Sequence, residues 1–69
     1  MKYENFDDAE ALRIAIIVEE EGLEFYTTLM NNAKDSKIKE LFSKLASAEK
    51  KHLALFQKAH LEINSPTSS

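Results

Sequence analysis

Three residues of this chain combine the side-chain types and the spacing of a metal site. Glu49 and His52 are three residues apart, so on a helix the two side chains point the same way, about one turn apart. Lys34 lies midway between Glu19 and Glu49, so a chain that turns back near Lys34 brings all three candidates to one level. Burying carboxylates without a partner is costly, and carboxylates with an imidazole suit iron, manganese or zinc. We therefore predict that Glu19, Glu49 and His52 bind a metal.

Two amphipathic helices are needed to bring these residues together. Apolar residues recur at alternating steps of four and three along two blocks of the chain, which is the spacing of packed helices in a bundle. The candidate ligands interrupt this pattern near the middle of each block. The first row reads Leu12, Ile16, Glu19, Leu23, Tyr26 and Met30, and the second reads Ile38, Phe42, Leu45, Glu49, His52, Phe56, Ala59 and Ile63.

Short polar motifs mark the ends of both helices. Asp7 followed three residues later by Glu10 is typical of a capping box, and Asp35 is a suitable N-cap for the second helix. Pro66 cannot continue a helix and disfavours helical backbone at the residue before it. We predict an all-α chain that forms a two-helix antiparallel hairpin. Residues 1–69 would form a single domain, with helices at about 7–32 and 36–62 and a disordered tail at about 65–69.

The composition limits the classes of protein to which the chain can belong. It has 69 residues and no cysteine, which excludes disulfides, cysteine-ligated zinc and iron–sulfur clusters and leaves a metal or a partner to stabilise a small core. The net charge of −3 argues against a basic nucleic-acid surface. No apolar run approaches the length of a membrane span, and the N-terminus lacks the apolar stretch of a signal peptide. We expect a cytoplasmic protein that binds neither nucleic acid nor membrane.

A second apolar stripe lies beside each row and is too wide for one hairpin to cover. Exposed apolar faces favour self-association, and a closed two-fold dimer is the commonest form of it. Two hairpins would form an antiparallel four-helix bundle with four carboxylates and two imidazoles at its centre. We therefore predict a homodimer at least, in which Gly22 permits close helix approach. In the first helix, the second stripe consists of Ala15, Val18, Gly22, Phe25 and Leu29. In the second helix, it consists of Leu41, Ala48 and Leu55, and Ala46 and Leu53 lie on the other side of the row.

The order of these residues resembles a known family. The pattern Ala15-Ile16-x-x-Glu19-x-x-Gly22-x-x-Phe25-Tyr26, followed by Leu41-Phe42-x-x-Leu45-Ala46-x-x-Glu49-x-x-His52, resembles the first helical pair of rubrerythrin-family proteins in the ferritin-like superfamily. The resemblance spans roughly residues 9–56 and implies a ferritin-like bundle with a di-iron site. It implies that Glu19, Glu49 and His52 are iron ligands, with Glu19 terminal and Glu49 bridging. It also implies that Tyr26 sits beside the metal.

The two-helix length is similar to that of encapsulated ferritins. Those proteins build a ferroxidase site across a dimer of hairpins, so this likeness implies an iron site shared between two chains and makes residence in a protein nanocompartment an open alternative. Residues 64–69 do not resemble the C-terminal targeting peptide that those proteins usually carry.

Three functions are compatible with the ligand set and the resemblance. The first is a ferroxidase that oxidises Fe(II) with dioxygen or peroxide at a site built across a homodimer. The second is a rubrerythrin-like peroxide reductase with the same site, recharged by an external electron donor. The third is a metal-stabilised dimerisation module without catalysis, which would bind zinc as readily as iron. The ligands identify a site better than they identify a substrate.

A group of acidic residues follows Glu19 in the sequence. Glu20, Glu21 and Glu24 are interpreted first as a solvated acidic face of the helix. The alternative is an entry patch that attracts cations toward the site by electrostatic focusing.

Overall fold

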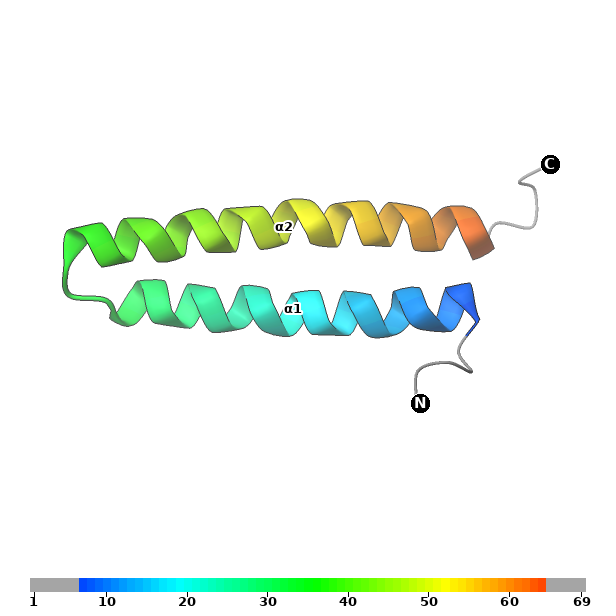
Figure 1. The fold of residues 1–69 in the computed structure, drawn as a ribbon, viewed down its shortest axis with the longest axis horizontal. Coiled ribbons are helices and arrows are strands. Elements are labelled where there is room, and N and C mark those ends of the chain that lie inside the picture. Colours follow the sequence, from blue (N-terminus) through cyan, green and yellow to red (C-terminus); the bar gives the residue numbers. More distant parts are fainter. Residues whose placement is uncertain (1–6, 65–69) are drawn as a thin grey trace.

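The chain folds as a pair of antiparallel helices. The computed structural model describes residues 7–64, so the tail predicted at 65–69 lies outside the described residues. Helix α1 spans Asp8–Asn32 and helix α2 spans Ser36–Asn64. Figure 1 shows the two helices side by side, joined at one end by a short connection. The predicted all-α helical hairpin is confirmed.

Helix α1 begins at a capping box. The backbone N–H of Glu10 donates to Oδ1 of Asp7 at 2.8 Å, and the N–H of Asp7 donates to Oε1 of Glu10 at 3.3 Å. Both motif residues are those identified in the sequence. The helix starts one residue later than predicted, because Asp7 serves as the N-cap and has extended backbone.

The connection of three residues reverses the chain and starts α2. Oδ1 of Asp35 accepts hydrogen bonds from the backbone N–H groups of Lys37 at 2.8 Å and Ile38 at 3.1 Å. At the other end of the connection, the N–H of Ala33 donates to the carbonyl of Met30 at 3.3 Å. A link this short is typical of antiparallel neighbouring helices in a bundle. Helix α2 ends two residues beyond the predicted end at about residue 62.

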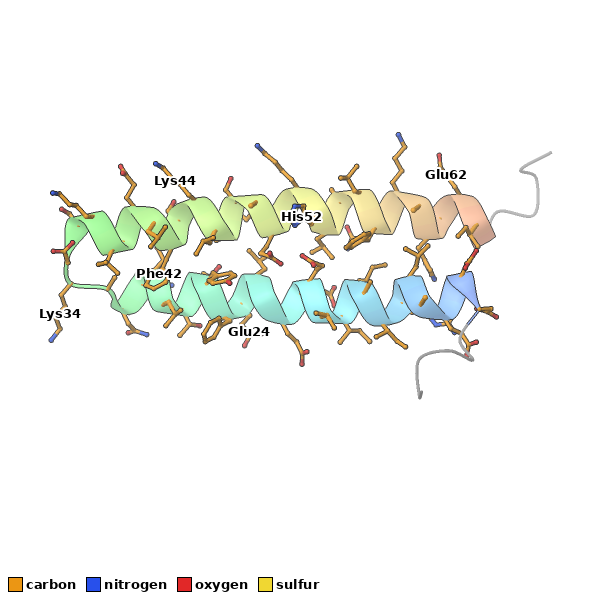
Figure 2. All side chains as sticks on the ribbon, viewed as in Figure 1. Glu24, Lys34, Phe42, Lys44, His52 and Glu62 are labelled. Atoms are coloured by element: carbon orange, nitrogen blue, oxygen red, sulfur yellow. The ribbon has the colours of Figure 1, made fainter. Side chains whose placement is uncertain are left out.

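The core is thin because one hairpin has only one internal seam. Ala46 is the sole buried apolar residue among those described, at 6% exposure. Most other apolar residues of the seam are half-buried, whereas Ile38 and Ile63 near the two ends of α2 are exposed. Figure 2 shows Phe42 pointing toward α1. Figure 2 also shows Glu24 and Lys44 pointing away from the opposite helix. Neither described helix is long and apolar enough to cross a membrane.

Large apolar side chains remain exposed along both helices. We call two of the stripes the open face: an α1 row of Val18 and Phe25, and an α2 row of Leu41, Ala48 and Leu55. The exposed fractions are 56% for Val18, 58% for Phe25, 49% for Leu41 and 65% for Leu55, and Ala48 is also exposed. Within each row the residues are seven apart, so each row forms one stripe along its helix. The hairpin therefore leaves the second apolar stripe of each helix largely uncovered.

Candidate metal centre

The structure brings together the three residues that the sequence singled out. Glu19 comes from α1, and Glu49 and His52 come from α2. One nitrogen or oxygen atom from each residue lies within 4.8 Å of those of the other two. His52 Nδ1 lies 3.8 Å from Oε2 of Glu19 and 3.9 Å from Oε1 of Glu49. One ligand atom from each of the three side chains thus converges on the same place in the hairpin.

These separations fit a shared cation. Nitrogen and oxygen ligands lie about 2.0–2.2 Å from a metal such as zinc, so two ligands of one ion are at most about 4.4 Å apart. The distances of 3.8 and 3.9 Å between His52 and the two carboxylates fall inside this limit. Glu19, Glu49 and His52 could therefore hold an ion with little rearrangement.

Glu19 carries the clearest sign of a missing positive partner. Its side chain is 19% exposed, and its Oε2 atom is buried without a hydrogen-bond partner among the described residues. A buried carboxylate oxygen in that state costs folding free energy. A bound cation would satisfy this oxygen directly, which is the observation that best supports a metal here.

Glu49 changes the protonation of Glu19. A hydrogen bond with the Glu49 carboxyl raises the pKa of Glu19 above its ordinary value of 4.5, and partial burial and the Glu49 charge act in the same direction. The charge of His52 lowers the pKa of Glu19 and only partly offsets these effects. The raised pKa makes a proton a stronger competitor for any metal ion at the Glu19 carboxylate.

Gly22 forms part of the wall of the site. A Cβ atom at this position would lie 3.1 Å from Oε2 of Glu49 and 3.6 Å from its Cδ. The sequence predicts that Gly22 lets two helices approach closely, but within the hairpin the free space is taken by a carboxylate. The sequence did carry a signal for the contact with Glu49, because the only glycine of the chain lies about one turn after Glu19.

The site opens toward the open face. Gly22 lies next to the α1 row, four residues after Val18 and three before Phe25, and faces the Glu49 side chain. His52 lies next to the α2 row, four residues after Ala48 and three before Leu55, and also faces Glu49. Both rows therefore flank the same carboxylate and lie on one side of the hairpin. The His52 side chain is 55% exposed, and in Figure 2 it lies over the α2 ribbon rather than in the seam.

Comparison with protein families shows which family the sequence matches. The sequence profile of the family described as Rubrerythrin matches residues 10–68, a range that includes all three converging residues. The chain belongs to the rubrerythrin family. Rubrerythrin-family proteins typically bind iron, and membership indicates a ferritin-like protein of the di-iron class. No curated protein and no solved structure matches the chain significantly.

Tyr26 is the residue that the rubrerythrin resemblance places beside the metal. Its ring is half-buried and packs against Phe25, with ring centroids 5.4 Å apart and an interplanar angle of 57°. Within residues 7–64 no hydrogen bond joins its hydroxyl to Glu19 or Glu49. A role for Tyr26 beside the metal of this rubrerythrin-family chain stays a prediction.

The acidic residues after Glu19 occupy the outer side of α1. Glu20, Glu21 and Glu24 are all exposed, and Glu24 points away from α2 in Figure 2. A shallow hollow beside Glu21 and Glu24 contains none of the three converging residues. This placement favours a solvated face over an entry patch for a rubrerythrin-type site.

Proposed function

We propose that the protein is a ferroxidase that oxidises Fe(II) with dioxygen or peroxide at a site shared by two copies of the chain. The single observation that carries this proposal is the convergence of Glu19, Glu49 and His52 around a buried carboxylate oxygen that has no hydrogen-bond donor. Membership of the rubrerythrin family supports iron as the metal. Iron is the substrate in this reaction.

Two copies supply what one hairpin lacks. One chain offers two carboxylates and one imidazole, whereas two chains related by a two-fold axis offer twice that number, which is the general plan of di-iron bundles. The open face flanks the ligands, and its exposed apolar rows favour burial against another protein surface. A second copy seated on the open face would cover His52 and complete the ligand set.

The ligand side chains favour the oxidised product. Two Fe(II) ions each lose one electron, and dioxygen gains both electrons and two protons to become hydrogen peroxide. With peroxide as the oxidant, the same two electrons and two protons yield two water molecules. The negative charges of Glu19 and Glu49 stabilise Fe(III) more than Fe(II), because the attraction grows with the charge of the cation. His52 contributes a neutral nitrogen donor when it is deprotonated.

Glu49 is suited to contact two ions. Its Oε1 atom faces His52, and its Oε2 atom faces the space beside Gly22, so the two oxygens point toward different neighbours. Glu19 lies on the opposite helix with its Oε2 atom toward His52. We assign Glu49 as the bridging carboxylate and Glu19 as a terminal ligand.

The test is an anaerobic Fe(II) titration followed by exposure to oxygen. We expect saturation at about two irons per dimer and fast growth of ferric absorption. Glu49→Ala should lose both the iron binding and the ferric absorption, because it removes the carboxylate that we assign as the bridge between the two irons. Glu24→Ala is the matched control, since it removes an exposed glutamate that points away from α2.

Three other outcomes would change the assignment. Faster oxidation by peroxide, with repeated turnover after a reductant is added, would indicate a peroxide reductase. Equal binding of zinc, with iron oxidation no faster than in buffer, would indicate a metal-stabilised dimerisation module. A folded dimer that binds no iron would refute a metal function altogether.

A further inference from the structure

Gly22 lies in the interior of α1, where a glycine weakens the helix. Glycine loses more conformational freedom on folding than any other residue. Its usual justification is a backbone with positive φ, but Gly22 does not have one. Any residue could adopt the backbone conformation found here, so the reason for a glycine must be the space beside it.

That space is occupied by one group. A Cβ at position 22 would stand 3.1 Å from Oε2 of Glu49, closer than the 3.4–4 Å of ordinary contact. Among the described residues, no atom of α2 outside the Glu49 carboxyl group comes within 4 Å of that point. The glycine therefore makes room for a carboxylate, and not for the backbone of the neighbouring helix.

The contact between Gly22 and Glu49 affects the directions in which the two carboxylate oxygens of Glu49 point. Oε2 rests against Gly22, while Oε1 lies 3.9 Å from Nδ1 of His52. A methyl group at position 22 would push Oε2 away by a few tenths of an ångström. Because the two oxygens belong to one rigid planar group, Oε1 would move relative to His52 as well.

We propose that Gly22 is a positioning residue that leaves the Glu49 carboxylate free to direct one oxygen toward each side of the site. The part of this inference that concerns metal affinity rests on the proposed iron-binding function. The part that concerns the carboxylate position does not, because the contact belongs to the chain itself.

The metal-free protein provides the first test. The variant is Gly22→Ala, and the matched control is Ala15→Gly, which changes helix propensity one heptad earlier on the same side of α1. We expect the ¹³C carboxyl resonance of Glu49 to shift in Gly22→Ala and to stay in place in Ala15→Gly. Gly22→Ala should melt no lower than the wild type, since alanine favours the helix. A Glu49 resonance that does not move in Gly22→Ala would overturn the proposal.

The second test measures metal affinity with Co(II), whose absorption spectrum reports its ligands. We expect Gly22→Ala to bind Co(II) about 10–100-fold more weakly, as is usual when the support of a ligand is disturbed. Adding Glu49→Asp shortens the side chain by one methylene and withdraws it from the new methyl group. Glu49→Asp should lower the Co(II) affinity of the wild-type protein. The same substitution should lower the Co(II) affinity of Gly22→Ala only slightly. If the losses of Co(II) binding free energy caused by the two substitutions simply add in the double variant, the proposal is overturned.

The two tests separate this inference from the proposed function. Wild-type protein that binds no Co(II) and no Fe(II) would refute the function, and the Glu49 resonance would then decide the role of Gly22 by itself. If the wild type binds metal, and Gly22→Ala keeps both the same Co(II) affinity and the same Glu49 resonance, the inference is refuted and the proposed function stands.

Discussion

The Glu19 carboxylate lies beside a second carboxylate and has one buried oxygen without a hydrogen-bond donor. Such a group destabilises the metal-free chain and is relieved by a proton or by a cation. The same side chain therefore links folding stability, pH and metal binding. This link makes Glu19 the residue at which the proposed site can be tested without measuring catalysis.

The pH dependence of stability follows from the raised pKa of Glu19. Because Glu49 raises this pKa, the folded chain binds the proton more tightly than the unfolded chain does. The metal-free protein should keep this stabilisation below pH 4.5 and lose it as pH rises through the raised pKa. Glu19→Gln removes the titration, so its stability should fall less over that pH range. Thermal unfolding of both metal-free proteins across a pH series measures the difference, and parallel curves would contradict the prediction.

Sequence patterns identified the three converging residues but not their surroundings. The equal spacing of Glu19 and Glu49 from Lys34, together with the three-residue step to His52, was enough to predict their convergence. The contact of Gly22 with Glu49 was missed, because it depends on side-chain torsions that residue spacing does not specify. The role of Glu19, Glu49 and His52 as metal ligands stays a prediction.

At the scale of elements, polar residues at the helix ends define the hairpin. The capping box of α1 and the Asp35 cap of α2 were both visible in the sequence, since each depends on contacts three residues apart or less. The end of α2 was placed two residues early. A proline affects mainly the residue before it, so helical backbone can continue to a point nearer to Pro66 than predicted.

Asp35 is expected to be the most sensitive position in the connection. Asp35→Ala removes the acceptor for two backbone N–H groups and should lower the free energy of unfolding by about 1 kcal/mol. Lys34→Ala changes the neighbouring exposed residue and should have little effect. Denaturant unfolding followed by circular dichroism measures both variants. Equal stabilities would show that Asp35 does not stabilise the start of α2.

At the scale of the whole molecule, the hairpin has one seam and one open face. The sequence predicted two apolar stripes per helix, and the structure leaves exposed those residues of the second stripe that form the open face. Spacing alone could not show which surface covers it, because a hydrophobic stripe does not specify its partner. The homodimer is a proposal that accounts for this exposure.

A charge on the open face should weaken the proposed dimer. Leu55→Lys places a cation at a position that is 65% exposed in the single chain and would be buried in the dimer. Leu61→Lys is the control, because Leu61 is 72% exposed and lies on another side of α2. Sedimentation should show dissociation for Leu55→Lys alone, with a matching loss of iron stoichiometry. A dimer that tolerates Leu55→Lys would place the interface elsewhere.

The short connection also limits how the length of this chain can change during evolution. Every residue added or removed between the connection and a ligand moves that ligand by about 1.5 Å and turns it by about 100°. A single deletion between residues 36 and 49 would therefore carry Glu49 and His52 away from Glu19 together. Removing about two turns from both helices on the same side of the site would keep all three in register. Insertions and deletions that preserve the centre are thus restricted to paired units of about seven residues.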